Sequence, residues 1–187
     1  MAIVNNNPIV HGMSGTIGGQ IVYRQRFGKT LGTKHPRKRP GPGTPAQEAA
    51  RLRIQQATIY SKAATADPEM KAAYQEVAPL GQSAFNVAVS DFYDAPDIED
   101  VDVTQYNGLP GSIIKAKVTD DFKVKSVHVA IIDPDGSIWE QGEAVMQPDG
   151  LHWIYTATSV NRSTIGDKIV VTASDYPANL TTAEKSL

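Results

Sequence analysis

Charge is divided unevenly along this chain, and the division limits what the chain can fold into. Residues 1–62 hold ten lysines and arginines but a single acid, Glu48, for a net charge of +9. Residues 63–187 hold eight lysines and arginines against nineteen acids, for a net charge of −11. The whole-chain value of −2 conceals this asymmetry. A cationic leading segment of this kind needs a negative surface, either nucleic acid or the acidic part of another copy.

The leading segment, residues 1–43, contains eight of the fifteen glycines. Residues 20–27 alternate in polarity, which predicts a strand with Ile21, Tyr23 and Phe27 on one face. Gly28-Lys29 suits a two-residue type II′ turn into a returning strand at 30–35, and the prolines of residues 36–42 then end regular structure. An isolated hairpin is marginal in water. We therefore expect an extended basic arm that gains order by lying on something else.

Residues 44–96 are predicted to be helical. Thr44-Pro45-Ala46-Gln47 has the pattern of a capping box with proline in the first turn, and this helix should run to about residue 64. Asp67-Pro68 repeats the start signal for a second helix that ends before Pro79. A third helix is expected over residues 83–92. Alanine-rich faces bury little area, so these helices should depend on packing against other parts.

Residues 97–187 are predicted to be all-β. Seven short strands are expected, over residues 98–105, 112–119, 124–132, 137–144, 151–158, 168–174 and 180–185, with turn signals such as Asn107-Gly108 between them. This spacing is typical of a β-sandwich, with Trp139, Trp153 and Tyr155 as core anchors. The fold class is therefore α+β: an arm with a β-hairpin (1–43), a short helical region (44–96) and a sandwich (97–187).

Two segments of the all-β region carry a family resemblance. They are Val118 to Ile132, followed by Asp135-Gly136, and the end strand Ala173 to Thr181. On these residues, the region 112–183 resembles a bacterial immunoglobulin-like domain. The resemblance implies an immunoglobulin-like sandwich and no particular activity. The chain departs from the family pattern at Ala178, where the family has glycine before the asparagine.

The first half carries a second resemblance. Its motifs are Gly15 to Gly19, Val22 to Gly28, Pro36 to Arg39, and Thr44 to Gln47 with Arg51. On these, residues 12–75 resemble uncharacterised proteins encoded by phages and prophages. The resemblance implies a role in a virion or in its assembly.

Seven cations within sixteen residues are the clearest chemical feature of the arm. They could neutralise phosphates, with Tyr23 and Phe27 near enough to stack on bases. They could instead dock on an acidic protein surface, or they could simply belong to a solvated linker. Ile21, Tyr23 and Phe27 are the expected apolar contacts of the arm. The candidate binding cations are Arg24, Arg26, Lys29, Lys34, Arg37, Lys38 and Arg39.

An acidic stretch at the junction of the helices and the all-β region is the natural complement of the arm. Asp120, Asp121 and Asp175 lie near strand ends and could hold calcium, but such residues more often cap turns, and no EF-hand loop is present. We therefore expect no metal site. The acidic complement consists of Asp91, Asp94, Asp97, Glu99, Asp100 and Asp102.

Several function classes find no support. The absence of cysteine excludes disulfides, thiolate metal sites and cysteine nucleophiles. The four histidines are scattered, and no phosphate loop, nucleophile elbow or dinucleotide loop is present. We expect no enzyme activity and no cofactor. No apolar run is long enough for a membrane span, and the leading residues do not form a secretion signal, so a virion or cytoplasmic location is expected.

The sequence thus predicts a structural, self-assembling protein, a component of a phage virion or a filament, in which the arm adds strands to a neighbouring copy. Its partners would be other copies of itself, in a homo-oligomer or polymer. The alternative is a nucleic-acid-binding protein that uses the arm on phosphates. A third reading, a carbohydrate-binding or adhesion module, requires Trp139, Trp153 and Tyr155 to be exposed together.

Overall fold

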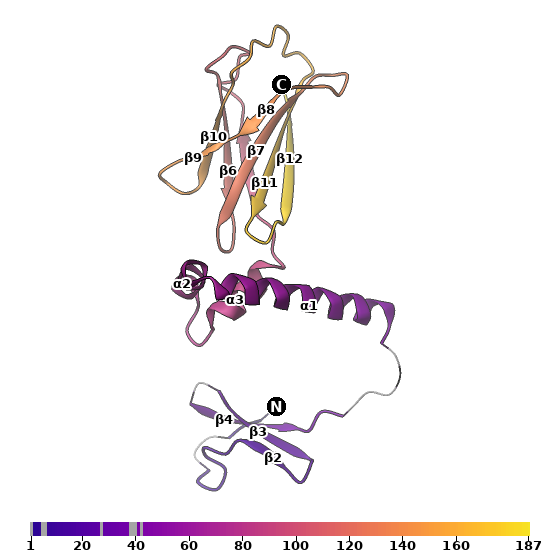
Figure 1. Ribbon diagram of the computed structural model, residues 1–187, viewed down its shortest axis with the longest axis vertical. Coiled ribbons are helices and arrows are strands. Elements are labelled where there is room, and N and C mark those ends of the chain that lie inside the picture. The colour runs from indigo at the N-terminus through magenta and orange to yellow at the C-terminus, as the bar shows by residue number, and fades with distance from the viewer. Residues whose placement is uncertain (1, 5–6, 27, 38–40, 42) are drawn as a thin grey trace. The chain divides into compact units, whose positions relative to one another are not determined.

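The computed structural model describes residues 2–4, 7–26, 28–37, 41 and 43–187. The chain forms two compact units, residues 1–51 and 52–187, which are described separately. The described residues form three helices and twelve strands, and every strand pairing is antiparallel (Figure 1). The predicted α+β class is therefore confirmed.

The first unit holds a four-stranded sheet. The predicted hairpin is confirmed, but Arg26 pairs with Lys29, so the predicted Gly28-Lys29 turn is wrong by one residue. Gly28, with φ at +70°, takes the second central position of the turn, where a residue in the left-handed region is needed. Two strands of three residues were not predicted, because so short a segment shows no periodicity. In the order β1-β4-β3-β2, the strands are β1 (Ala2–Val4), β4 (Lys29–Lys34), β3 (Ile21–Arg26) and β2 (Gly15–Ile17).

The three predicted helices are confirmed. Thr44 and Gln47 form the capping box: the Thr44 N–H donates to Gln47 Oε1 at 3.2 Å, and the Gln47 N–H donates to Thr44 Oγ1 at 3.3 Å. Asp67 caps the second helix, with proline in its first turn, and Ser83 caps the third. The helices are α1 (Pro45–Ala66), α2 (Pro68–Val77) and α3 (Ala84–Asp91).

Eight strands follow the helices in the second unit. They include all seven predicted strands, with ends shifted by a few residues, and a two-residue strand, Val145–Met146, that was not predicted. They form two sheets, ordered β5-β6-β10-β9 and β12-β11-β7-β8. The strands are β5 (Asp97–Asp102), β6 (Ile113–Thr119), β7 (Val124–Ile132), β8 (Ile138–Glu143), β9 (Val145–Met146), β10 (His152–Thr156), β11 (Lys168–Asp175) and β12 (Leu180–Ser186).

Both of these sheets contribute to one apolar core. Burial alternates along β6 and β11, as expected for strands with one face turned inward. Trp153 and Tyr155 are each 6% exposed, which confirms them as core anchors. Trp139 is 45% exposed, so its prediction as an anchor is wrong. The pairing of β7 with β8 is irregular at this point, so that Glu140 takes the inward position opposite Ile131.

Candidate functional site

The N-terminal sheet gathers three of the predicted cations on one face. Facing residues of an antiparallel pair project to the same side. Arg24 faces Leu31 and Arg26 faces Lys29, so the three cations share a side. We call this side the cationic face; with the three cations it carries Ile3, Thr16, Val22, Leu31 and Thr33.

The two sides of this sheet make different contacts. On the side opposite the cationic face, Thr30 is 1% exposed and its Oγ1 accepts from the Gly12 N–H at 3.1 Å. Gln25 Nε2 donates to the Met13 carbonyl at 2.8 Å, which also ties the segment before β2 to that side. On the cationic face, Arg24 and Lys29 are exposed, and Ile3 is 52% exposed. Among the described side chains of residues 1–51, Thr30 alone is buried.

The remaining predicted arm residues lie elsewhere. Tyr23 and Ile21 lie on the side opposite the cationic face, and Lys34 pairs with Ile21 there. Lys34 and Arg37 line a cleft of about 610 Å³ near the turn between β2 and β3. The predicted contacts Phe27, Lys38 and Arg39 lie outside the described residues.

The predicted acidic complement does not form one continuous acidic surface. Asp94, Asp97 and Asp100 are exposed, and the last two lie on β5, at one edge of its sheet. Asp91, by contrast, is only 2% exposed. Its position on the buried side of α3, beside Ala84 and Ala88, explains this.

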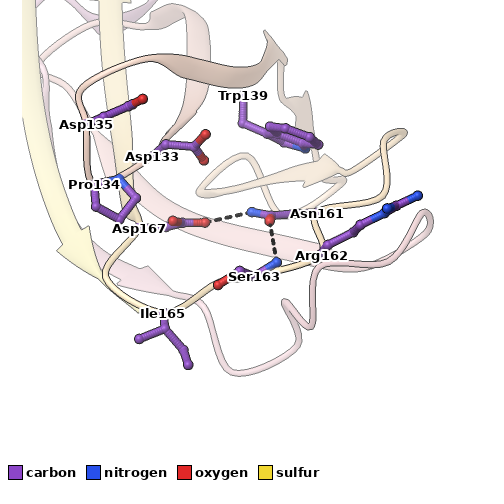
Figure 2. Close-up of a pocket in the computed structure, with 9 residues that line it drawn as sticks. All are labelled: Asp133, Pro134, Asp135, Trp139, Asn161, Arg162, Ser163, Ile165 and Asp167. Atoms are coloured by element: carbon purple, nitrogen blue, oxygen red, sulfur yellow. Dashed lines mark hydrogen bonds between the residues drawn. The ribbon is translucent and has the colours of Figure 1, made fainter.

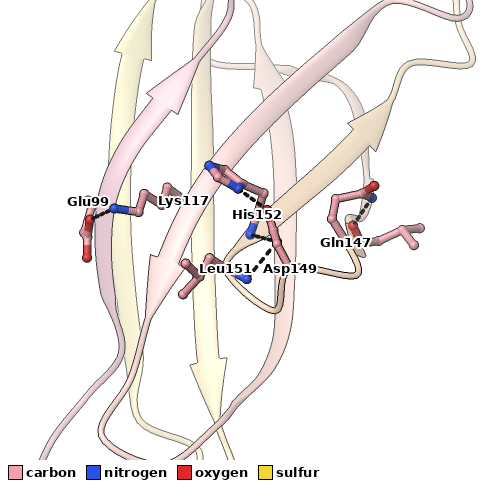
Figure 3. Close-up of polar contacts among 7 residues, drawn as sticks. Glu99, Lys117, Gln147, Asp149, Leu151 and His152 are labelled. Carbon is pink, nitrogen blue, oxygen red and sulfur yellow. Dashed lines mark hydrogen bonds and ion pairs between the residues drawn. The ribbon is translucent and has the colours of Figure 1, made fainter.

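Two further members of the acidic complement are held by local partners. Glu99 forms an ion pair with Lys117 on the neighbouring strand (Figure 3) and also accepts from Thr119, and these bonds lower its pKa. Asp102 accepts from the N–H and hydroxyl of Thr104, which likewise lowers its pKa. Figure 3 also shows Asp149 accepting from the backbone of the following turn. The complement is thus reduced to the exposed aspartates at the start of β5.

Three aspartates meet where the helices adjoin the two sheets. Asp91 ends α3, Asp120 follows β6, and Asp175 ends β11. Each contributes one carboxylate oxygen, and these oxygens lie within 4.8 Å of one another. We call this group the junction carboxylates. Asp121, which the sequence placed with Asp120 and Asp175, is exposed and stands outside the group.

The environment of the junction carboxylates disfavours negative charge. Burial raises the pKa of Asp91 to about 6; the hydroxyl of Tyr74 lowers it in part, and the charges of Asp120 and Asp175 raise it further. Burial and the charge of Asp175 also raise the pKa of Asp120, although nearby backbone N–H groups offset part of the rise. Burial raises the pKa of Tyr74 as well, and its ring stacks on Phe122 at 4.0 Å between centroids.

A second buried acid, Glu140, has a contrasting environment. Its Oε1 accepts from the Tyr155 hydroxyl at 2.9 Å and from the N–H and hydroxyl of Thr158 at 2.6 and 2.7 Å. Its Oε2 accepts from the Ser159 N–H at 3.2 Å. Burial acts to raise the pKa of Glu140, but these hydrogen bonds outweigh it and lower the pKa. Gly142 makes room for the Tyr155 ring, since a Cβ there would stand 3.0 Å from it.

A cleft of about 500 Å³ opens among the loops next to Trp139 (Figure 2). Asp167 lies in its wall, accepts from Asn161 Nδ2 at 2.6 Å and keeps Oδ1 without a partner. An aromatic wall beside carboxylates could contact a sugar. The adhesion reading, however, required Trp153 and Tyr155 to be exposed with Trp139, and both are buried, so that reading is wrong.

Sequence reasoning missed two features of these sites. It did not assign Glu140 or Tyr74 any role, and it grouped Asp91 with surface acids. The sequence held no signal for Glu140, because the irregular pairing of β7 with β8 decides which residue of β8 points inward. The signal for Asp91 was its spacing on the helix from Ala84 and Ala88, which marks the buried side.

Comparisons with known proteins identify no family. No protein-family model matches the chain, and no curated protein matches it. Among solved structures, a crystal structure of an engineered protein is 17% identical, with a TM-score of 0.35. The match covers 49% of this chain and 19% of that protein, so the chain spans about a fifth of its length. Within the described residues, no helix has the length and apolar character needed to cross a membrane.

Proposed function

We propose that this chain is a structural protein that assembles with other copies of itself. The cationic face of its N-terminal sheet docks on the acidic second unit of a neighbouring copy. The phage-like motifs of residues 12–75 support a place in a virion or filament. The two antiparallel sheets with a shared core support an immunoglobulin-like sandwich as the folded body.

The observation that carries this proposal is the cationic face, on which Arg24, Lys29 and Ile3 are exposed. A sheet normally buries at least one face against another layer, because its hydrogen bonds alone give little net stability. Here Thr30 and Gln25 tie one side to residues 12–13, while the cationic face carries the exposed Ile3 and the half-buried Val22 and Leu31 among three cations. Aliphatic side chains give a contact its area, and cations select an anionic partner.

The partner we assign to the cationic face is a second copy of this chain. Residues 63–187 carry a net charge of −11, which matches the +9 of residues 1–62. The exposed aspartates Asp94, Asp97 and Asp100 lie within seven residues, the first just before the edge strand β5 and the other two on it. A contact between two different surfaces of one protein is head-to-tail, and it produces rings or filaments.

Docking through a face differs from the strand addition expected from the sequence. Strand addition was expected because a lone hairpin leaves two edges unpaired. The structure fills these edges with β1 and β2. New strands could join only β1 or β2, each of three residues, so the face offers the larger contact.

Nucleic acid is the alternative occupant of the cationic face. Binding to single strands combines phosphate contacts with bases stacked on aromatic rings. Tyr23 is on the opposite side of the sheet from Arg24 and Lys29, so one strand of nucleic acid could not reach both in this way. This separation favours the protein partner.

The test measures the mass of the full chain in solution by light scattering, with electron microscopy for rings or filaments. The intact protein should form assemblies at low salt that shrink as salt rises. The double variant Arg24→Glu, Lys29→Glu should raise the protein concentration at which assemblies form by at least tenfold.

The matched control reverses two exposed helical lysines, Lys62 and Lys71, to glutamate, which changes the net charge equally. This variant should assemble like the intact chain. A monomeric intact protein, or equal loss in both variants, would overturn the proposal. Salt-sensitive binding to duplex DNA with no self-association would establish the alternative.

A further inference from the structure

The junction carboxylates are three acids that lie together without counter-charges. Asp91 is 2% exposed and Asp175 is fully buried. Among the described residues, none of the ion pairs involves any of the three. Negative charge that is buried without a cation is costly, and a bound cation would remove this cost.

Several oxygens of this group also lack hydrogen-bond partners. Asp91 Oδ1 and both carboxylate oxygens of Asp120 are buried and accept no hydrogen bond. An acid that capped a turn would use its oxygens on backbone N–H groups. The backbone N–H groups of Asp121, Phe122 and Lys123 nevertheless act on the Asp120 carboxylate and offset part of the rise in its pKa that burial causes, so Asp120 keeps part of the turn-capping role that the sequence favoured.

The remaining oxygens of the group are held in place. The Tyr74 hydroxyl donates to Asp91 Oδ2 at 2.5 Å. The N–H and side-chain amide of Asn179 donate to the two oxygens of Asp175 at 2.6 and 2.7 Å. Outer contacts of this kind orient the ligands of metal sites. Tyr74 leaves the other oxygen of Asp91 available for an ion.

We infer that Asp91, Asp120 and Asp175 bind a divalent cation, and that the cation is calcium. The donors are all oxygen, which suits calcium and magnesium. Two oxygens that each lie about 2.4 Å from one calcium ion are at most about 4.8 Å apart. The separation in the structure meets this limit. Calcium also tolerates irregular sites completed by water, whereas magnesium requires a near-ideal octahedron.

Two clefts adjoin the site. Asp91 lines a cleft of about 200 Å³ with Phe122, and Asp120 lines a separate cleft of about 510 Å³. Because Asp91 Oδ1 and both Asp120 oxygens are enclosed, an ion and its water ligands would enter as side chains beside these clefts move. The bound ion would join the end of α3, the loop after β6 and the end of β11.

The experiment uses the full chain, treated with chelator and exchanged into metal-free buffer. Titration calorimetry with calcium chloride should show one ion per chain. At a hundredfold excess over Kd, calcium should raise Tm by roughly 5–10 °C. Terbium should bind in its place and emit on excitation of tyrosine, because Tyr74 contacts the ligand Asp91. Calcium should quench that emission by competition.

The variant Asp120→Asn should weaken calcium binding at least tenfold. Its matched control, Asp121→Asn, removes the same charge from the exposed neighbour and should keep the affinity within about twofold. Absence of calcium binding to the intact chain would overturn the inference, and this result does not depend on any variant folding. Equal loss in both variants, or tighter binding of magnesium than of calcium, would also overturn it.

Discussion

Glu140 and Asp91 are buried acids of the second unit that differ in one respect. Glu140 is 8% exposed, and its carboxylate accepts four hydrogen bonds. Asp91 is 2% exposed, and one of its oxygens accepts none. The pKa of Glu140 is lowered, whereas that of Asp91 is raised to about 6. Burial of an acid therefore does not define its role; the supply of donors does.

This difference separates a structural acid from a ligand-binding one. Donors around Glu140 replace the water that the carboxylate loses, so its negative charge is accommodated by the protein itself. The junction carboxylates have donors for some oxygens only. The rest of their negative charge needs a proton or a cation, and this is the property of a binding site.

The largest effect is expected at Glu140. In Glu140→Gln, one oxygen becomes an NH₂ group, which cannot accept from the Thr158 or Ser159 N–H groups that now meet it. We expect the free energy of unfolding to fall by about 1–3 kcal/mol. Urea denaturation at pH 7 measures this loss. The control Glu143→Gln, an exposed position on the same strand, should stay within about 0.5 kcal/mol.

The stability lost in Glu140→Gln should depend on pH in a direction that the pKa of Glu140 sets. Because the folded-state pKa is lowered, this acid stabilises the fold above its unfolded pKa of about 4.3 and loses that contribution as the pH falls through the folded value. The difference between the intact chain and Glu140→Gln should therefore be constant near neutrality and shrink in acid. A difference that grew in acid would contradict the assignment.

At Asp120 we expect the opposite sign when chelator is present. Asp120→Asn removes one negative charge from a group without counter-ions, so the metal-free protein should gain about 1 kcal/mol. Urea denaturation in chelator measures the gain, with Asp121→Asn as the control at an exposed site. A loss of stability as large as that of Glu140→Gln would mean that the two acidic sites do not differ.

The smallest effect is expected at Ala178, in the turn that leads to Asn179. Its φ is +70°, a conformation that costs a residue with a Cβ about 1 kcal/mol. Ala178→Gly should raise stability by roughly 0.5 kcal/mol, after allowance for the greater freedom of glycine in the unfolded chain. Ala183→Gly, in the middle of β12, should lower it. If both variants are destabilised, the turn is not strained.

Patterns that repeat along the chain were sufficient to predict most elements. Alternation located the seven longer strands of the second unit, and capping signals located all three helices. The short strands β1, β2 and β9 could not be predicted, since two or three residues carry no period. Trp139 was misplaced because composition favours a buried tryptophan, whereas the local irregularity between β7 and β8 decided which side chain points inward.

The sites were harder to predict because their residues are far apart in sequence. The three cations of the cationic face lie within six residues, so pairing across one hairpin brings them together. Asp91, Asp120 and Asp175 come from a helix, a loop and a strand, and only the packing of α3 makes them neighbours. Sequence spacing identified two of the three and put Asp121 in place of Asp91.

The burial of Thr30 alone has a consequence for how fast the sheet of the first unit opens. Among the described side chains there, this small hydroxyl-bearing residue is the sole one enclosed, so opening the sheet exposes almost no hydrocarbon to water. The amide protons of the N-terminal sheet should exchange with deuterium long before those of the strands around Trp153. In the proposed assembly, a segment that opens at so little cost would detach from one molecule and bind the next while the rest of the chain stays folded.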